Sequence, residues 1–182
     1  EDPSKVFLAD RHSGVPGSAI VVLMEGSRPI TVEIQALTTP SNLPSPRRVV
    51  TGIDSSRLHL ALAVIARRLN MRVANQDVII NVPGGLRVRE PAADLGLMLA
   101  LVSSFQNEPV ASKVAVAAEV GLGGELRSVP AGGRRAGDAR RLGLTKCLLA
   151  PPPDETVARE EKAIGCYHVS TVQEAVDMAI VS

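Results

Sequence analysis

Aromatic residues are almost absent from the chain, which has no tryptophan, one tyrosine and two phenylalanines in 182 residues. Single-stranded nucleic acids are commonly bound by stacking their bases on aromatic side chains, so this shortage nearly excludes base stacking as a binding mode. Hydrophobic residues still make up 45% of the chain, and the core must therefore be aliphatic. A chain of 182 residues is long enough for one well-buried domain, or at most two very small ones.

Cysteine and histidine are also scarce. The two cysteines, Cys147 and Cys166, cannot build a disulfide framework or a four-cysteine zinc site, and both fall in short apolar segments typical of buried, inert thiols. The three histidines, His12, His59 and His168, show no metal-ligand spacing. We therefore expect no metal site in this chain, and a reducing, cytoplasmic setting.

Signals for targeting and for nucleotide binding are missing as well. No signal peptide is visible and no apolar run reaches membrane-spanning length, so we expect a soluble protein with no membrane partner. No G-x-x-x-x-G-K-S/T phosphate loop occurs, which argues against nucleotide hydrolysis by this chain. The chain starts without methionine, and we expect residues 1–17 to be a loose lead-in from a longer protein and residues 18–182 to form the domain.

The hydrophobic pattern predicts strands interleaved with helices. A hairpin is expected between 20 and 37, with its turn at Gly26 and Ser27. Apolar stripes and capping residues then predict a series of helices and short strands. The helices are expected at 54–71, 91–102, 132–142, 154–164 and from Thr171 onward, and the strands at 78–82, 114–118, 146–150 and 166–169. This order indicates an α+β domain, with a mixed sheet and packed helices.

The most informative stretch runs from 84 to 104. Residues 91–102 are almost continuously apolar, with Asp94 their only charge, which predicts a buried central helix opened by Pro91. Residues 84–89 consist of two glycines followed by alternating apolar and basic residues. The helix therefore begins beside a basic, glycine-rich segment, and we expect the function of the domain to be located there.

Charge is unevenly distributed although the net charge is only +1. Residues 47–89 carry eight arginines against two aspartates, and residues 127–146 carry five arginines and a lysine against one aspartate. Sixteen of the twenty basic residues are arginine, the side chain best suited to bidentate phosphate contacts. The clustering favours a polyanion-binding face over an ordinary solvated surface.

Two motifs resemble the proteolytic domain of Lon-type proteases. Residues 91–93 (Pro-Ala-Ala) match the Gly-Pro-Ser-Ala-Gly motif that carries the nucleophilic serine of that family, and residues 130–133 (Pro-Ala-Gly-Gly) match the segment before its lysine. The serine position is then Ala92 and the lysine position Arg135. A methyl group cannot attack a carbonyl, and arginine stays protonated and cannot act as a base. The resemblance implies a Lon proteolytic-domain-like fold in which the catalytic dyad is lost.

Helical spacing supports this alignment. Arg135, Ala139 and Leu142 share one face of the predicted helix, so Arg135 should point inward. We expect it to form a buried ion pair with Asp94 or Glu90 where the family has its catalytic centre.

A closer resemblance involves segments 26–37, 47–54, 90–94 and 119–127. They are similar to the Lon-like C-terminal domain of a family of bacterial DNA repair and recombination ATPases. The resemblance implies a ring-forming platform, hexameric in the family, that binds single- or double-stranded DNA without sequence preference and supports branch migration, with a recombinase as a further candidate partner. ATP, magnesium and zinc would bind only in an N-terminal part of such proteins, and we expect no cofactor in this chain.

Arginines that follow glycine turns are the candidates for DNA contact, because glycine lets the backbone approach phosphates closely. We rank Arg87 and Arg127 first, followed by Arg89, Arg47 and Arg48. Two other functions stay open. One is an active Lon-like peptidase with an unrecognised nucleophile, and the other is a pure assembly module whose arginines make salt bridges between subunits.

Overall fold

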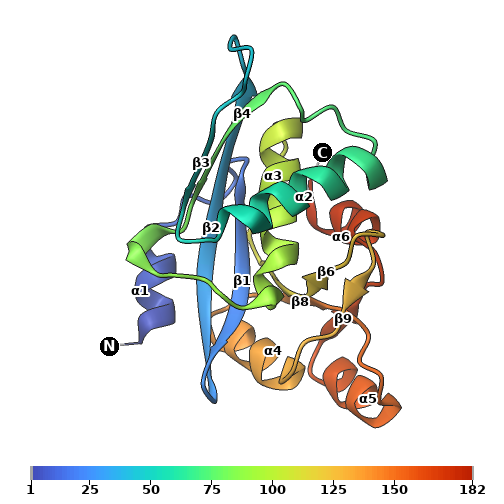
Figure 1. Cartoon of the computed structure of the whole chain (residues 1–182). Helices are drawn as coiled ribbons and strands as arrows, with labels where there is room; N and C mark the ends of the chain where they lie inside the picture. Colours follow the sequence, from blue (N-terminus) through green and yellow to red (C-terminus); the bar gives the residue numbers. More distant parts are fainter. Residues whose placement is uncertain (1, 182) are drawn as a thin grey trace.

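A seven-stranded mixed sheet forms the centre of the molecule, and helices cover both of its faces (Figure 1). The structure is a computed structural model that describes residues 2–181. The strand order is β3-β4-β2-β1-β5-β8-β9, in which β2 is antiparallel to both of its neighbours and the other four pairs are parallel. The predicted α+β architecture with a mixed sheet is confirmed.

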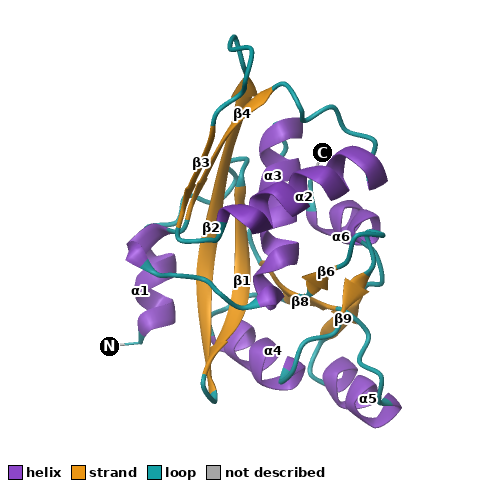
Figure 2. Cartoon of the chain, viewed as in Figure 1, coloured by secondary structure: helices purple, strands orange, loops and turns teal. Residues whose placement is uncertain are grey.

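The predicted helices and strands appear in the predicted order, and α1 and β3 are additional to them (Figure 2). The strands of the sheet are β1 (Ser18–Glu25), β2 (Arg28–Pro40), β3 (Arg48–Thr51), β4 (Gln76–Asn81), β5 (Val114–Ala117), β8 (Lys146–Leu149) and β9 (Cys166–His168), and β6 (Glu119–Val120) pairs with β7 (Leu126–Arg127) as a small separate ribbon. The helices are α1 (Pro3–Ala9), α2 (Ser55–Arg68), α3 (Asp94–Gln106), α4 (Gly132–Arg141), α5 (Glu155–Ala163) and α6 (Val172–Ala179), with short 3-10 turns η1 (Pro83–Gly85) and η2 (Pro91–Ala93).

Strand β1 is buried on both faces, which explains its unbroken apolar run. Ile20 and Val22 face a small cluster that includes residues of α1 and α4. Val21 and Leu23 face the main core, to which α2, α3 and α6 contribute. The sheet is therefore the middle of three layers.

Helix α3 is the predicted central helix, and ten of its residues are buried. It begins at Asp94, because Pro91 opens the 3-10 turn η2 and not the α-helix itself. Gly96 brings this helix close to β1, since a Cβ atom at that position would lie only 1.9 Å from Cγ1 of Val21. Glycine is required here by space and not by backbone conformation.

Two helix ends depart slightly from the predicted ones. The carboxylate of Asp54 caps α2 as expected, but this helix stops at Arg68, before Asn70 takes a positive φ of 54°. At α6, Thr171 accepts the N–H of Glu174, while the Glu174 carboxylate accepts from Ser170, one residue before the cap. The capping box is thus present in a shifted form.

Residues 3–9 are not a loose lead-in, and that part of the prediction is wrong. They form α1, whose Ser4 is buried and accepts the backbone N–H of Thr31 at 3.0 Å. Its hydroxyl lies 3.4 Å from the carboxylate of Asp138, which also accepts the Thr31 hydroxyl at 2.7 Å. Because a buried carboxylate is costly without donors, Asp138 anchors α1 to the sheet.

Among residues 2–181, none of the helices has the length and hydropathy that crossing a lipid bilayer would demand. In the same part of the chain, no three histidine, cysteine or acidic side chains are grouped so that they could hold a metal ion.

Gly96 in α3 and Gly137 in α4 offer a matched test of the packing. Gly96→Ala should lower the free energy of unfolding by about 1–3 kcal/mol, because its methyl group overlaps Val21. Gly137→Ala in α4 meets nothing within 4 Å and should raise stability by about 0.5–1 kcal/mol. Urea denaturation of both variants measures the two effects, and equal shifts of the same sign would contradict the packing of α3 on β1.

Candidate functional site

A pocket of about 630 Å³ opens at the N-terminal end of α3. Its wall comes from the end of β3, the start of α2, the segment 86–90 and the first turn of α3. The charged residues that line it are three arginines and three acids: Arg57, Arg87, Arg89, Asp54, Glu90 and Asp94. The basic segment lies beside the start of the buried helix, as the sequence predicted, and the structure adds a cavity where the two meet.

Residues 86–90 cross the pocket as an extended strap. The strap is not a regular strand, since it makes only one parallel bridge, between Val88 and Ile53, with the Val88 N–H donating to the carbonyl of Gly52 at 2.7 Å. Val88 is nevertheless buried while Arg87 and Arg89 are exposed, so the two arginines keep the shared orientation that alternation implied.

Arg57 supplies the third cation of the pocket, and sequence reasoning assigned it no role. Its Nη1 lies 3.2 and 3.1 Å from the two carboxylate oxygens of Asp94. Helical spacing contained a usable signal, because Arg57 lies one turn before the buried Ala61 and hence at the edge of the buried face of α2. Its acidic partner, 37 residues away in the chain, could not be deduced from that spacing.

Asp94 is a buried carboxylate with an unusual protonation equilibrium. Burial raises its pKa from 3.8 to about 6 and outweighs the opposing effects of the Val120 N–H, which donates to it at 3.2 Å, and of Arg57. Glu119 raises the pKa further through its like charge. Asp94 therefore changes charge near neutral pH, inside a pocket that carries three arginines.

Arg135 points inward as predicted, and its side chain is only 1% exposed. It forms an ion pair with Glu90, which was one of the two expected partners, while the other, Asp94, pairs with Arg57. The guanidinium also donates through Nε to the carbonyl of Pro130 and through Nη1 to that of Val22, both at 2.9 Å. All three nitrogens of Arg135 are thus used inside the fold.

This pair closes an edge that backbone pairing leaves open. Strand β5 pairs with β1 only at Ile20 and Val21. Beyond these two residues, Arg135 donates a hydrogen bond to the carbonyl of Val22. The second carboxylate oxygen of Glu90 accepts the N–H of Met24 at 2.8 Å. Side chains therefore satisfy backbone groups that would otherwise be buried without partners.

Ala92, the position that the family resemblance aligns with a serine nucleophile, is fully buried. It packs in an apolar cluster with Ala117, Ala136 and Cys147. Burial raises the pKa of the Cys147 thiol to about 12 and that of Cys166 to about 11, so both thiols stay protonated at neutral pH, as the prediction of inert cysteines required.

The serines further along α3 have structural partners. The Ser103 hydroxyl donates to the carbonyl of Glu108 at 2.5 Å and accepts the N–H of Gly17 at 2.9 Å. The Ser104 hydroxyl accepts the N–H of Thr38 at 2.9 Å. Neither hydroxyl lies at the pocket, whose lining includes no residue of α3 beyond Leu97.

The other three arginines proposed for DNA contact lie outside the pocket. Arg48 donates to the carbonyls of Gln76 and Ala74 and holds the edge of the sheet. Arg47 is exposed and its guanidinium lies 3.8 Å from the Asp77 carboxylate. Arg127 is 64% exposed, with its guanidinium 3.5 Å from the carboxylate of Glu125. The structure thus brings Arg87 and Arg89 together and leaves the first-ranked Arg127 on a separate ribbon.

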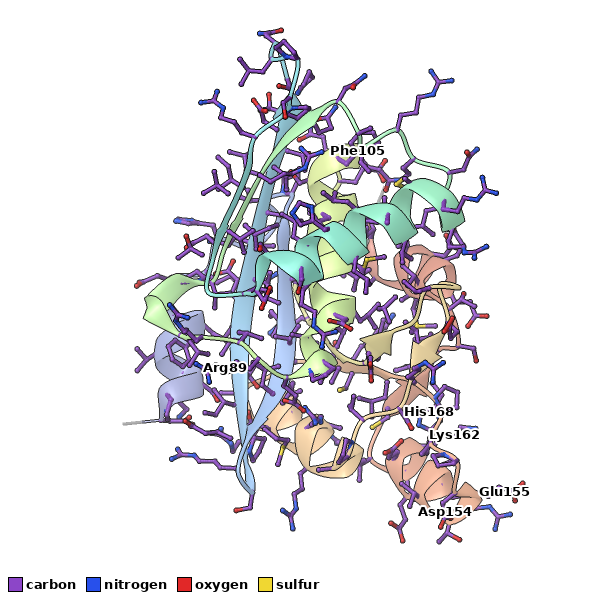
Figure 3. All side chains as sticks on the ribbon, in the orientation of Figure 1. Arg89, Phe105, Asp154, Glu155, Lys162 and His168 are labelled. Atoms are coloured by element: carbon purple, nitrogen blue, oxygen red, sulfur yellow. The ribbon has the colours of Figure 1, made fainter. Side chains whose placement is uncertain are left out.

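Further acidic side chains lie on α5 and at its N-terminal cap. Figure 3 shows Arg89 on the strap and Asp154 and Glu155 at the start of α5, well separated across the molecule. Helix α5 has a single buried residue, Glu161, which pairs with His168 at 2.6 Å. The arginine pocket and the acidic helix therefore belong to different parts of the surface.

Comparison with known proteins identifies the architecture. Residues 58–181 match the family described as Lon protease (S16) C-terminal proteolytic domain. The chain is 41% identical over 98% of its length to the DNA repair protein RadA of Halalkalibacterium halodurans, and 45% and 43% identical over 82% and 81% of its length to the RadA proteins of Haemophilus influenzae and Escherichia coli. It spans only 39%, 32% and 32% of those three relatives.

Removing the carboxylate of Glu90 tests the buried pair. Glu90→Ala leaves the Arg135 guanidinium buried without its counter-charge and should lower the free energy of unfolding by about 3–5 kcal/mol. Glu125→Ala removes the acid of the exposed Arg127 pair and should cost less than about 1 kcal/mol. Chemical denaturation compares the two, and a similar small loss in both variants would contradict a structural role for the Arg135–Glu90 pair.

Proposed function

The chain belongs to the Lon protease C-terminal domain family and is similar along nearly its whole length to bacterial DNA repair proteins, and from this we propose that it is a DNA-binding domain without peptidase activity. The observation that carries the proposal is the pocket at the start of α3, into which α2 brings Arg57 and the strap brings Arg87 and Arg89. Grouped guanidinium groups suit phosphate oxygens. With almost no aromatic side chains to stack on bases, binding should be independent of sequence and strongly dependent on salt.

Peptidase chemistry has no support in the pocket. The aligned dyad positions hold a buried methyl group at Ala92 and a permanently charged, fully engaged guanidinium at Arg135. The nearby thiol of Cys147 has its pKa raised by burial, so it is a poor substitute nucleophile.

The larger assembly is part of the same proposal. We infer a ring, hexameric as the family resemblance implies, whose DNA contacts support branch migration in the cytoplasm, with a recombinase as a further partner. ATP, magnesium and zinc would be bound by regions that this chain does not include. The resemblance and the similarity to RadA proteins support this assembly, and the arginine pocket supplies its DNA contact.

DNA binding by paired variants is the direct test. Arg87→Ala/Arg89→Ala should weaken binding about tenfold or more at low salt and reduce the salt dependence by roughly two released counterions. The matched control is Arg67→Ala/Arg72→Ala, which removes the same charge from exposed positions outside the pocket. Arg127→Ala tests the separate ribbon. Fluorescence anisotropy with single- and double-stranded DNA at two salt concentrations gives the affinities.

The same preparations decide between the alternatives when their mass in solution is measured. Loss of binding in the pocket variant with unchanged assembly supports the phosphate-binding pocket. Equal losses of DNA affinity in the pocket and control variants would show that binding depends on the overall charge of the domain and not on the pocket. Salt-independent or absent binding by an assembled ring would leave a pure scaffold whose arginines serve contacts between subunits.

The peptidase alternative has its own test. The domain should not cleave unfolded casein and should not be labelled by a serine-directed fluorophosphonate probe, because the only serine that lines the pocket, Ser56, has no lysine or histidine beside it in that lining to act as its base. An active Lon-type peptidase run in parallel validates the assay. Covalent labelling of any serine, located by mass spectrometry, would overturn the proposal that the domain lacks peptidase activity.

A further inference from the structure

Arg57 is only partly used by its acidic partner. Both contacts to Asp94 are made by Nη1. Within residues 2–181, Nε and Nη2 of Arg57 have no hydrogen-bond partner, and the side chain is 34% exposed. In the same described region, neither Arg87 nor Arg89 has a carboxylate within 4 Å. The pocket therefore presents unused guanidinium donors from both α2 and the strap.

Asp94, in the first turn of α3, lines the same pocket and contacts Arg57 directly. Its side chain is 8% exposed and is fixed by the Val120 N–H on β6 and by Arg57 on α2. The other charged groups around it are Glu119 on β6 and the remaining residues that line the pocket, Asp54, Arg87, Arg89 and Glu90. An anion that approaches Arg57 thus meets a carboxylate that already occupies part of the same guanidinium.

We propose that the pocket is a site for a tetrahedral oxyanion of the phosphate class, and that Asp94 is its internal competitor, so that anion binding at Arg57 is coupled to uptake of a proton by Asp94. This inference rests on the proposed phosphate-binding role of the pocket and adds to it an acid, Asp94, that competes with the anion for Arg57. The competition follows from geometry, since one guanidinium cannot fully neutralise two anions in a half-enclosed cavity.

The sign of the pH dependence follows from linkage. The free domain has an Asp94 pKa of about 6. A bound dianion next to Arg57 raises that pKa further, because it adds negative charge and shares the counter-cation. Affinity is therefore lowest at high pH, where Asp94 is ionised in both states. It rises as the pH falls through the pKa of the complex, and levels off below about 6, where Asp94 is protonated in both states.

Sulfate is the appropriate probe because, unlike phosphate, its charge stays constant between about pH 5 and pH 8. Titration at constant ionic strength, followed by NMR shifts of the α2 and strap amides, should show at least about threefold tighter binding at pH 5.5 than at pH 8. Calorimetry in two buffers of different ionisation enthalpy should show net proton uptake near pH 7. Arg57→Ala should abolish binding, and Arg67→Ala, ten residues further along α2 and about 15 Å away, should not.

Variants of the acid make the test specific. Asp94→Asn should bind sulfate with the same affinity at both pH values, and more tightly than wild type at pH 8. Glu119→Gln removes a like charge that raises the Asp94 pKa, so it should shift the pH midpoint downward without abolishing the effect. This second variant keeps the test decisive even where Asp94→Asn fails to fold.

Three outcomes would overturn the inference: absence of sulfate binding, wild-type affinity that does not depend on pH, or pH dependence that survives in Asp94→Asn. The proposed function is judged separately. DNA binding that is lost in Arg87→Ala/Arg89→Ala but unaffected by Asp94→Asn at every pH would support DNA contact and reject the competitor. Proton-coupled sulfate binding without any DNA binding would support the role of Asp94 as competitor and reject the proposed DNA contact.

Discussion

The buried pair of Arg135 and Glu90 is the interaction on which the shape of the pocket depends. It joins the start of α4, the open edge of β1 and the end of the strap at a single point. Without it, a guanidinium and several backbone groups would be buried without partners, at a cost comparable to a large part of the stability of a domain. The position of Arg87 and Arg89 on the strap is therefore a consequence of an interaction that neither of them makes.

The pocket combines charges of both signs, and this distinguishes it from a simple basic patch. Arg57 is held by Asp94, while the strap arginines are exposed. A purely basic cavity would hold a polyanion tightly at one place. Internal carboxylates weaken each contact and let bound phosphates exchange, which suits the sequence-independent, salt-dependent DNA binding that we propose. The acidic residues of α5 lie well away from Arg89 and leave this surface free (Figure 3).

Periodicity predicted those features that depend on neighbouring residues in the chain. The hairpin, the buried helix α3, the cap of α2 and the inward direction of Arg135 all follow from spacing of two or about four residues. The contacts that the sequence pattern could not predict join segments that are distant in the chain. Ser4 and Asp138 are 134 residues apart, and the guanidinium of Arg48 meets carbonyls that no sequence motif marks.

The site was predictable to the same extent and for the same reason. Pattern located the entrance to α3 and limited the partner of Arg135 to two acids, because a buried guanidinium needs a counter-charge and few acids lie near that helix in the alignment. The sequence pattern could not show which acid pairs with Arg135 and which with Arg57, because the pairing depends on how α2 and α4 approach α3 in three dimensions.

The closed edge of β1 has a consequence for the history of the sequence. Positions 90 and 135 satisfy each other and also Val22, Met24 and Pro130, so a change at either one alone leaves the remaining groups unsatisfied. Lysine at position 135 could not make the forked contacts of the guanidinium. A path from this chain toward a Lon-type dyad would therefore pass through variants in which these buried groups lack partners. The fold itself thus holds arginine at position 135.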